Sequence, residues 1–291
     1  MRNLFLLFGH SNKTQPTNKN LVKGISTFML LTSLACSQLV FAEPTEAEQK
    51  ATLAKKLSNP IAALISLPIQ YNYDSDIGPV DRGSRSTLNI QPVIPFSISD
   101  DWNLISRTIL PVINQQDIFS PGQSQKGIGD VVQSIFFSPK APTNSGWIWG
   151  AGPVLLLPTG SNAKLSADKL GLGPTAVALK QDGAWTYGGL ANHMISVGGP
   201  SNKADINATF LQPFLSYNTK TATTFSVNTE STYDWKSKQW AVPINANVSQ
   251  MIKLGEQLFS VGAGVKYWLK STDNGPEGLG FRLTFTMLFP K

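Results

Sequence analysis

Charged and amide side chains occupy alternate positions in several apolar segments of this sequence. Asn245 and Asn247, for example, alternate with apolar neighbours in "VPINANVS". Side chains of a β-strand point to opposite faces with a period of two, so this spacing predicts strands with one polar and one apolar face. If the sheet closes, the polar faces either line a solute path or bond one another and fill the middle. The candidates for this lumen are Arg107, Glu230, Lys266, Arg282, Gln91, Gln212, Asn228, Asn245 and Asn247.

The faces of segment 102–112 are ambiguous, because Arg107 lies on the same side as the apolar Ile105 and Ile109. An arginine that faces lipid at the bilayer midplane costs roughly 2 to 4 kcal/mol. We therefore expect Arg107 to point inward and to take the two isoleucines with it. Segments 128–138 and 184–196 contain no such residue, so the sequence does not assign their faces.

Catalytic chemistry has little support, and we expect no enzyme. His193 is the only histidine beyond residue 42, and the single cysteine is Cys36, so neither paired-histidine nor cysteine metal sites are expected. The Gly-x-Gly sequences at 150–152 and 262–264 lack the third glycine and the helix of a dinucleotide site, so no cofactor is expected. A barrel hydrolase would need a hydroxyl nucleophile beside His193. Ser196 is three residues away, on the opposite face of a regular strand, but a serine from a neighbouring strand keeps this alternative open.

The elements that must position these side chains are long strands. Most exceed the 9 to 11 residues with which a tilted strand crosses a bilayer, whereas soluble strands have about five or six. We expect them at 60–73, 85–99, 102–112, 128–138, 145–157, 172–180, 184–196, 205–217, 221–233, 239–250, 257–269 and 279–289.

The connections between these segments alternate in length. Those after odd-numbered segments are long, such as "NQQDIFSPGQSQKG", and those after even-numbered segments are short, such as "SDD" and "QDG". Long loops on one rim and short turns on the other are typical of outer-membrane barrels. The sequence therefore predicts an all-β, antiparallel up-and-down transmembrane β-barrel of about 12 strands over residues 60–291, with both termini on the short-turn rim.

Composition on the two faces supports a lipid-facing exterior. The polar faces combine amides, hydroxyls and charges, whereas a packed soluble core would place aliphatic side chains in the centre. Tyrosine and tryptophan gather near segment ends, as interfacial girdles do, although aromatic residues also favour strands in general. These aromatic residues are Tyr71, Tyr73, Trp102, Trp147, Trp149, Trp185, Tyr187, Tyr217, Tyr233, Trp240, Tyr267 and Trp268.

The first 42 residues have the organisation of a cleaved signal peptide. Basic residues precede an apolar run, and small residues before Glu43 fit a cleavage site. The residue three positions before Cys36 is a serine, which disfavours lipidation. Removing residues 1–42 takes four of the 24 Lys and Arg residues and none of the 18 acidic ones, which leaves a charge of +2. Such a charge gives no support for nucleic-acid binding.

Residues 43–59 are the one clear helical segment. Thr45 and Glu48 have the spacing of a capping box, and Pro60 follows the segment. This helix is expected to lie in the periplasm or to enter the lumen as a plug. A linker that frays is an equal alternative.

Several long motifs between residues 60 and 291 carry a resemblance. They include "LNIQPVIPFSISDDWNLISRTILPVI", "GIGDVVQSIFFSPK", "GPTAVALKQDGAWTYGGLANH", "TESTYDWKSKQWAVPINANVSQ" and "GPEGLGFRLTFTMLFP". The sequence resembles Gram-negative outer-membrane proteins often labelled, misleadingly, neuromedin U homologues, which are related to MetA-pathway phenol-degradation transporter-like proteins. The resemblance implies an outer-membrane barrel with a transport role, and it supplies neither a substrate nor catalytic residues.

Prolines depart from the expected strand pattern. Each removes a ladder hydrogen bond, so we expect bulges or kinks at several of them. They are Pro68, Pro92, Pro95, Pro111, Pro153, Pro213 and Pro243.

Together these features favour a narrow, porin-like outer-membrane channel or transporter for small molecules, including apolar ones. Its expected partners are outer-membrane lipid, an unidentified solute and the outer-membrane assembly machinery. A barrel hydrolase using His193 and a structural or adhesive barrel acting through its long loops are the alternatives.

Overall fold

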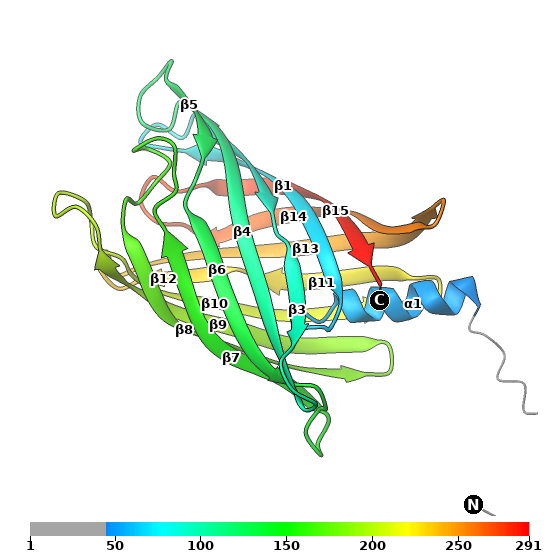
Figure 1. Cartoon of the computed structure of the whole chain (residues 1–291). Coiled ribbons are helices and arrows are strands. Elements are labelled where there is room, and N and C mark those ends of the chain that lie inside the picture. The colour runs from blue at the N-terminus through cyan, green and yellow to red at the C-terminus, as the bar shows by residue number, and fades with distance from the viewer. Residues whose placement is uncertain (1–44, 291) are drawn as a thin grey trace, which may run out of the picture. The chain divides into compact units, whose positions relative to one another are not determined.

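The computed structural model describes residues 45–290, which form a closed antiparallel β-barrel and one short helix (Figure 1). The expected signal peptide lies outside the described residues. The elements are α1 Glu46–Leu57, β1 Ile65–Ile77, β2 Gly83–Ile90, β3 Val93–Ser97, β4 Trp102–Gln116, β5 Ser124–Ile128, β6 Val131–Pro139, β7 Trp147–Leu157, β8 Leu170–Asp182, β9 Trp185–Gly198, β10 Asn207–Asn218, β11 Thr223–Thr229, β12 Ser231–Asp234, β13 Gln239–Leu254, β14 Gln257–Lys270 and β15 Glu277–Phe289.

These segments make twelve strands, because three strands are each interrupted once. The interruptions separate β2 from β3, β5 from β6 and β11 from β12. Every strand pairs with its neighbours along the chain, and β1 pairs with β15 from Ile65↔Phe289 to Ser75↔Glu277, which closes the ring. The predicted twelve-stranded antiparallel barrel is thus confirmed.

Prolines account for part of the irregularity. Pro92 lies between β2 and β3, and the register shifts between Val242 and Pro243. Both changes agree with the loss of a backbone donor at proline. Pro68 and Pro213 instead lie within continuous register, opposite Thr286 and Gly189. The expected distortions therefore occur at some of these prolines and are absent at others.

Strand alternation separates an apolar outside from a mostly enclosed inside. In β14, Val265 and Tyr267 are 57% and 50% exposed, whereas Lys266 between them is 5% exposed. A one-layer sheet buries only its inner face, so exposed aliphatic side chains in this pattern lie on the outer surface. Contiguous exposed apolar surface of this kind marks a membrane or partner contact.

Side-chain exposure also assigns the faces of segments 128–138 and 184–196, which the sequence leaves open. In β6, Phe136 is fully enclosed and Phe137 is exposed. In β9, Leu190 is buried, whereas Trp185 and Tyr187 are exposed. Phe136 and Leu190 therefore point into the barrel, and the aromatic residues at the start of β9 point out.

Aromatic rings form paired contacts near both rims of the outer surface. Near the short turns, the ring centroids of Trp185 and Tyr217 are 4.8 Å apart. Near the long loops, Tyr233 lies 4.8 Å from Trp235 and 5.0 Å from Trp240. Two such levels match the interfacial girdles of membrane barrels.

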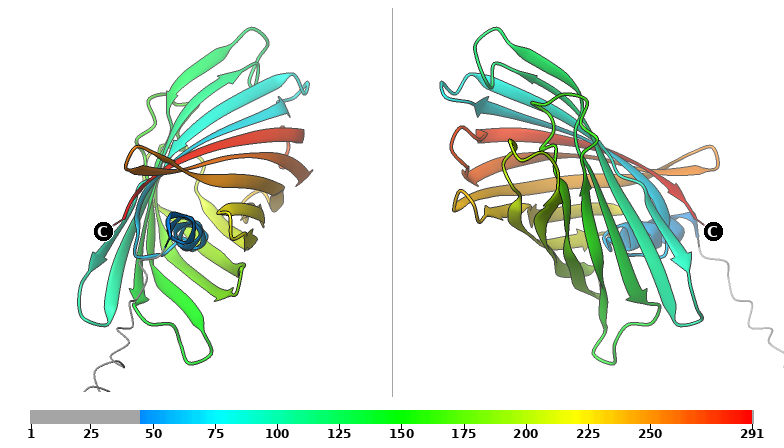
Figure 2. Two further views of the ribbon diagram at one scale, coloured as in Figure 1. Left: turned by 90° about the vertical axis from the view of Figure 1, so that its right-hand side faces the viewer. Right: turned by 60° about the vertical axis from the view of Figure 1, so that its left-hand side comes forward.

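Helix α1 lies within the ring of strands at the rim of the short turns, and the left view of Figure 2 shows it nearly end-on. Thr45 and Glu48 form the predicted capping box, with the Thr45 backbone N–H donating to Glu48 Oε2 at 2.8 Å. Leu53 and Ala54 pack against inward residues of the barrel, including Met251 and Leu288. Among residues 45–290, no helix has the length and apolarity needed to span a membrane.

Candidate functional site: the barrel lumen

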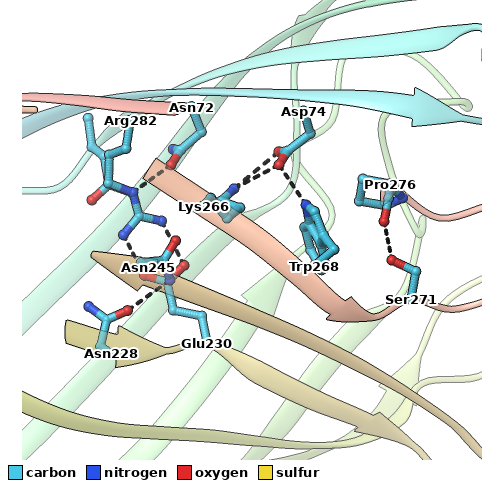
Figure 3. Close-up of polar contacts among 11 residues, drawn as sticks. Asn72, Asp74, Asn228, Glu230, Asn245, Lys266, Trp268, Ser271, Pro276 and Arg282 are labelled. Atoms are coloured by element: carbon cyan, nitrogen blue, oxygen red, sulfur yellow. Dashed lines mark hydrogen bonds and ion pairs between the residues drawn. The ribbon is translucent and has the colours of Figure 1, made fainter. Parts of the chain in front are cut away.

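A network of charged and amide side chains covers one inner wall of the barrel (Figure 3). Arg282 of β15 forms a two-pronged ion pair with Glu230, with Nη1 to Oε1 at 3.0 Å and Nη2 to Oε2 at 2.8 Å. Its Nε donates to Asn72 Oδ1 of β1 at 2.8 Å. Glu230 lies at the interruption between β11 and β12, and its carboxylate reaches the guanidinium.

A second ion pair lies on the same wall, toward the long loops. Lys266 Nζ donates to both carboxylate oxygens of Asp74, at 3.0 and 3.2 Å. Trp268 Nε1 donates to Asp74 Oδ1 at 2.9 Å, so this indole faces the lumen. The expectation that Trp268 belongs to the outer aromatic girdle is therefore wrong, because its only polar atom finds an acceptor inside.

The nine residues proposed from the sequence all lie in or beside the lumen. Gln91, Arg107, Gln212, Asn228, Asn247 and Arg282 line its cavity. Glu230 and Lys266 belong to the ion pairs behind this lining, and Asn245 donates to Asn228 Oδ1 at 2.8 Å. Arg107 points inward as the energetic argument requires, and its Nη2 donates to Gln91 Oε1 at 3.2 Å.

The opposite inner wall is apolar, which the sequence analysis did not predict. Ile105 shares Arg107's inward face and is fully buried in this wall. The inward position of Ile105 agrees with the expectation for its segment. The apolar inner surface that continues over β6 to β10 was not expected. The apolar cluster consists of Ile61, Ile105, Phe136, Val177, Leu179 and Leu190, with Val93, Ile148, Phe210 and Phe214 packed against it.

A cavity of about 310 Å³ lies between the two walls. Residues 58–64, which connect α1 to β1, form part of its lining at the end nearest the short turns. Gln181 Nε2 donates to the Lys55 carbonyl oxygen at 2.8 Å, and Ser58 exchanges hydrogen bonds with Asn218. These contacts hold the end of α1 against β8 and β10, so the helical segment narrows this end of the lumen.

Loop 158–169 covers part of the other end. It lies against the inner side of β5, where a Cβ on Gly127 would meet the Ser161 hydroxyl and force that side chain to move. Glycine therefore makes room for this close approach. Asp130 anchors the loop by accepting from the backbone N–H groups of Gly160 and Ala167, at 3.0 and 2.7 Å.

Two ion pairs connect this loop to loop 199–206. Lys169 pairs with Asp205 at 3.0 Å, and Lys203 pairs with Asp168. The hydrogen bond from Lys203 lowers the pKa of Asp168, and the hydrogen bond from Lys169 lowers that of Asp205. Loops 158–169 and 199–206 are thus joined at the mouth of the barrel.

Asn72, Asp74 and Asp130 are functional candidates that the sequence analysis missed. Asn72 and Asp74 alternate with Tyr71 and Tyr73 in "QYNYD", so the alternation used elsewhere could have found them. Asp130 follows Gly129 at a strand interruption, and only the fold brings loop 158–169 to it.

His193 lies on the outer face of β9, away from the lumen. Its Nδ1 is 2.9 Å from Thr209 Oγ1, which also accepts a hydrogen bond from Trp235 Nε1 at 2.9 Å. Ser196 instead donates to Asp205 Oδ1 at 3.2 Å. Within residues 45–290, no cluster of three or more His, Cys, Asp or Glu side chains could hold a metal ion.

The sequence matches no protein-family profile and no curated protein. Assignment to the neuromedin U homologue family therefore stays a prediction. The COG4313 outer membrane channel from Pseudomonas putida F1 has 13% identity, with a TM-score of 0.60 over 78% of this chain and 96% of its own. Outer membrane phospholipase A from Escherichia coli has 10% identity, with a TM-score of 0.45 over 77% and 96% of the two chains. The likeness to the COG4313 channel shows that the two chains share a β-barrel fold.

Proposed function

We propose that this chain is a narrow channel or transporter for small amphipathic molecules in the outer membrane of a Gram-negative bacterium. The observation that carries the proposal is the cavity of about 310 Å³ inside a closed barrel, with a polar wall on one side and an apolar wall on the other. Twelve strands fall between the filled interior of eight-stranded barrels and the open channel of sixteen-stranded ones.

The outer surface supports a place in lipid. Exposed aliphatic side chains cover β13 to β15, and aromatic pairs lie near both rims. Outer-membrane lipid is then the partner of the outer face, a small solute is the partner of the lumen, and the assembly machinery inserts the barrel. The quoted sequence motifs, together with the fold shared with the COG4313 channel, support a transport family.

Matched tryptophan substitutions on β15 test the channel. Thr284 lines the cavity, and its neighbour Leu283 is 51% exposed on the outer face. Thr284→Trp adds bulk inside the lumen and is expected to reduce ion conductance in planar bilayers and solute uptake by liposomes. Leu283→Trp adds the same bulk toward lipid and is expected to leave both unchanged. The channel would be contradicted if the unmodified protein showed only background conductance and uptake, and if both stayed at background after deletion of residues 45–64.

The hydrolase alternative depends on His193 and its contact with the Thr209 hydroxyl. A nucleophile needs a base within hydrogen-bond reach, and this pair meets that distance. Both side chains belong to the outer face, so a lipid ester would be the substrate. Equal ester hydrolysis by the unmodified protein and by His193→Ala would exclude this role, whereas loss of activity in the variant would displace the channel proposal.

A further inference from the structure

Arg107 is a lumen cation whose hydrogen-bonding capacity is largely unused. A guanidinium carries five N–H donors, and the Nη2 of Arg107 donates to Gln91 Oε1 at 3.2 Å. Among residues 45–290, no carboxylate forms an ion pair with it. Arg107 also lines the cavity.

Two other inner cations are paired with carboxylates. Arg282 is neutralised by Glu230 and Lys266 by Asp74. Arg85 donates through Nε to Gln115 Oε1 at 2.9 Å and lies opposite Asp74 in the β1–β2 register. Arg85 and Arg107 both lack an ion pair among residues 45–290, but Arg85 is not part of the cavity lining. Of the two arginines that line the cavity, Arg107 is therefore the one without a carboxylate partner.

The cavity lining favours an anion. Its charged residues are Lys56, Arg107 and Arg282, and no aspartate or glutamate belongs to the described lining. Burying a charge is unfavourable unless it is paired, so a ligand that brings the missing negative charge is stabilised here. Guanidinium and carboxylate groups match in geometry and form parallel hydrogen bonds.

The rest of the lining favours a ligand with an apolar body. Val93 and Phe214 line the cavity and belong to the edge of the apolar cluster. Val93 lies directly opposite Arg107 in the register of β3 and β4, so apolar surface begins beside the cation. A volume of about 310 Å³ corresponds to a small molecule.

We propose that Arg107 is the anion-recognition residue of the lumen and that the cavity binds small organic monocarboxylates. The carboxylate accepts hydrogen bonds from the free N–H groups of Arg107, and the apolar body packs toward Val93 and Phe214. This assignment rests on the proposed function, because it names the class of solute that the lumen takes.

Calorimetric titration of the full-length protein in detergent tests the site with benzoate and its neutral analogue benzamide. The unmodified protein is expected to bind benzoate more tightly than benzamide. Arg107→Gln is expected to weaken benzoate binding roughly tenfold or more, the usual effect of losing hydrogen bonds to a charged group, and to leave benzamide binding unchanged. Arg107→Lys keeps the charge without the planar fork and is expected to bind benzoate with intermediate affinity.

Arg82→Gln is the matched control, because Arg82 is exposed in the loop between β1 and β2 and loses the same charge. It is expected to bind benzoate as the unmodified protein does. Equal affinity of the unmodified protein for benzoate and benzamide overturns the proposal without reliance on any variant. Tighter binding of phenyl phosphate than of benzoate overturns the assignment to carboxylates.

Conductance separates this inference from the channel itself. If the protein conducts ions but Arg107→Gln retains its preference for benzoate, the recognition site is wrong and the channel stands. If benzoate binding depends on Arg107 but conductance and uptake stay at background, the site stands and the channel fails.

Discussion

Glu230 neutralises Arg282 inside the barrel wall. The Arg282 side chain is 5% exposed and that of Glu230 27%, so water compensates little for the loss of either partner. Removing one member of a buried ion pair typically costs about 3 to 5 kcal/mol, because the other charge stays buried and unpaired.

Glu230→Gln is therefore expected to lower the free energy of unfolding by about 3 to 5 kcal/mol, measured by urea unfolding in lipid vesicles. Glu277→Gln removes the same charge from an exposed position and is expected to change the free energy of unfolding by less than about 0.5 kcal/mol. Equal unfolding midpoints for the two variants would contradict the structural role of the Glu230 pair.

At the scale of elements, loops 158–169 and 199–206 are joined by two ion pairs whose carboxylates respond to pH. The pKa values of Asp168 and Asp205 are lowered by hydrogen bonds from Lys203 and Lys169. A carboxylate whose pKa is lowered on folding stabilises the folded contact above its ordinary pKa of about 3.9. That contribution is lost as the pH falls through the lowered value, so we expect the two ion pairs to hold at neutral pH and to be lost in acid.

Fluorescence anisotropy of a dye on Ala163→Cys, in a Cys36→Ser background, follows this separation. The anisotropy is expected to be high at neutral pH and to fall below about pH 4, where the carboxylates gain protons. Adding Asp168→Asn and Asp205→Asn is expected to produce the low anisotropy already at neutral pH. The control Asp100→Asn changes an exposed carboxylate in a short turn and is expected to behave as the unmodified loops do. Persistence of high anisotropy in the double variant would show that other contacts hold the loops.

At the scale of the whole molecule, a closed ring of strands stays folded in mild detergent until it is heated. The protein is expected to partition with the membrane fraction and to migrate faster on a gel when left unboiled than after boiling. The measurement is the apparent molecular mass of the unboiled and the boiled sample on the same gel. Recovery as a dissolved monomer without detergent would contradict the lipid-facing exterior.

The sequence predicts the barrel well, because strand alternation and loop length are local signals. Arg107 was placed correctly inside from the cost of a charge in lipid, and Ile105 followed it. The apolar inner wall was missed because an inward leucine and a lipid-facing leucine have the same local pattern. The ion pairs were missed for another reason: ring closure brings Asp74 to Lys266 over a separation of 192 residues, and no local spacing records that contact.

The position of α1 constrains the order in which the barrel assembles. Residues 58–64 join α1 directly to β1, and β1 pairs with the last strand, β15. Leu53 and Leu64 share one cluster with Leu288 of β15, so the earliest and latest parts of the described chain are neighbours. The helix can complete its binding site only when the C-terminal strand arrives, after the entire barrel has been synthesised. The complete contact surface of the helix is therefore present only once the C-terminal strand has closed the ring.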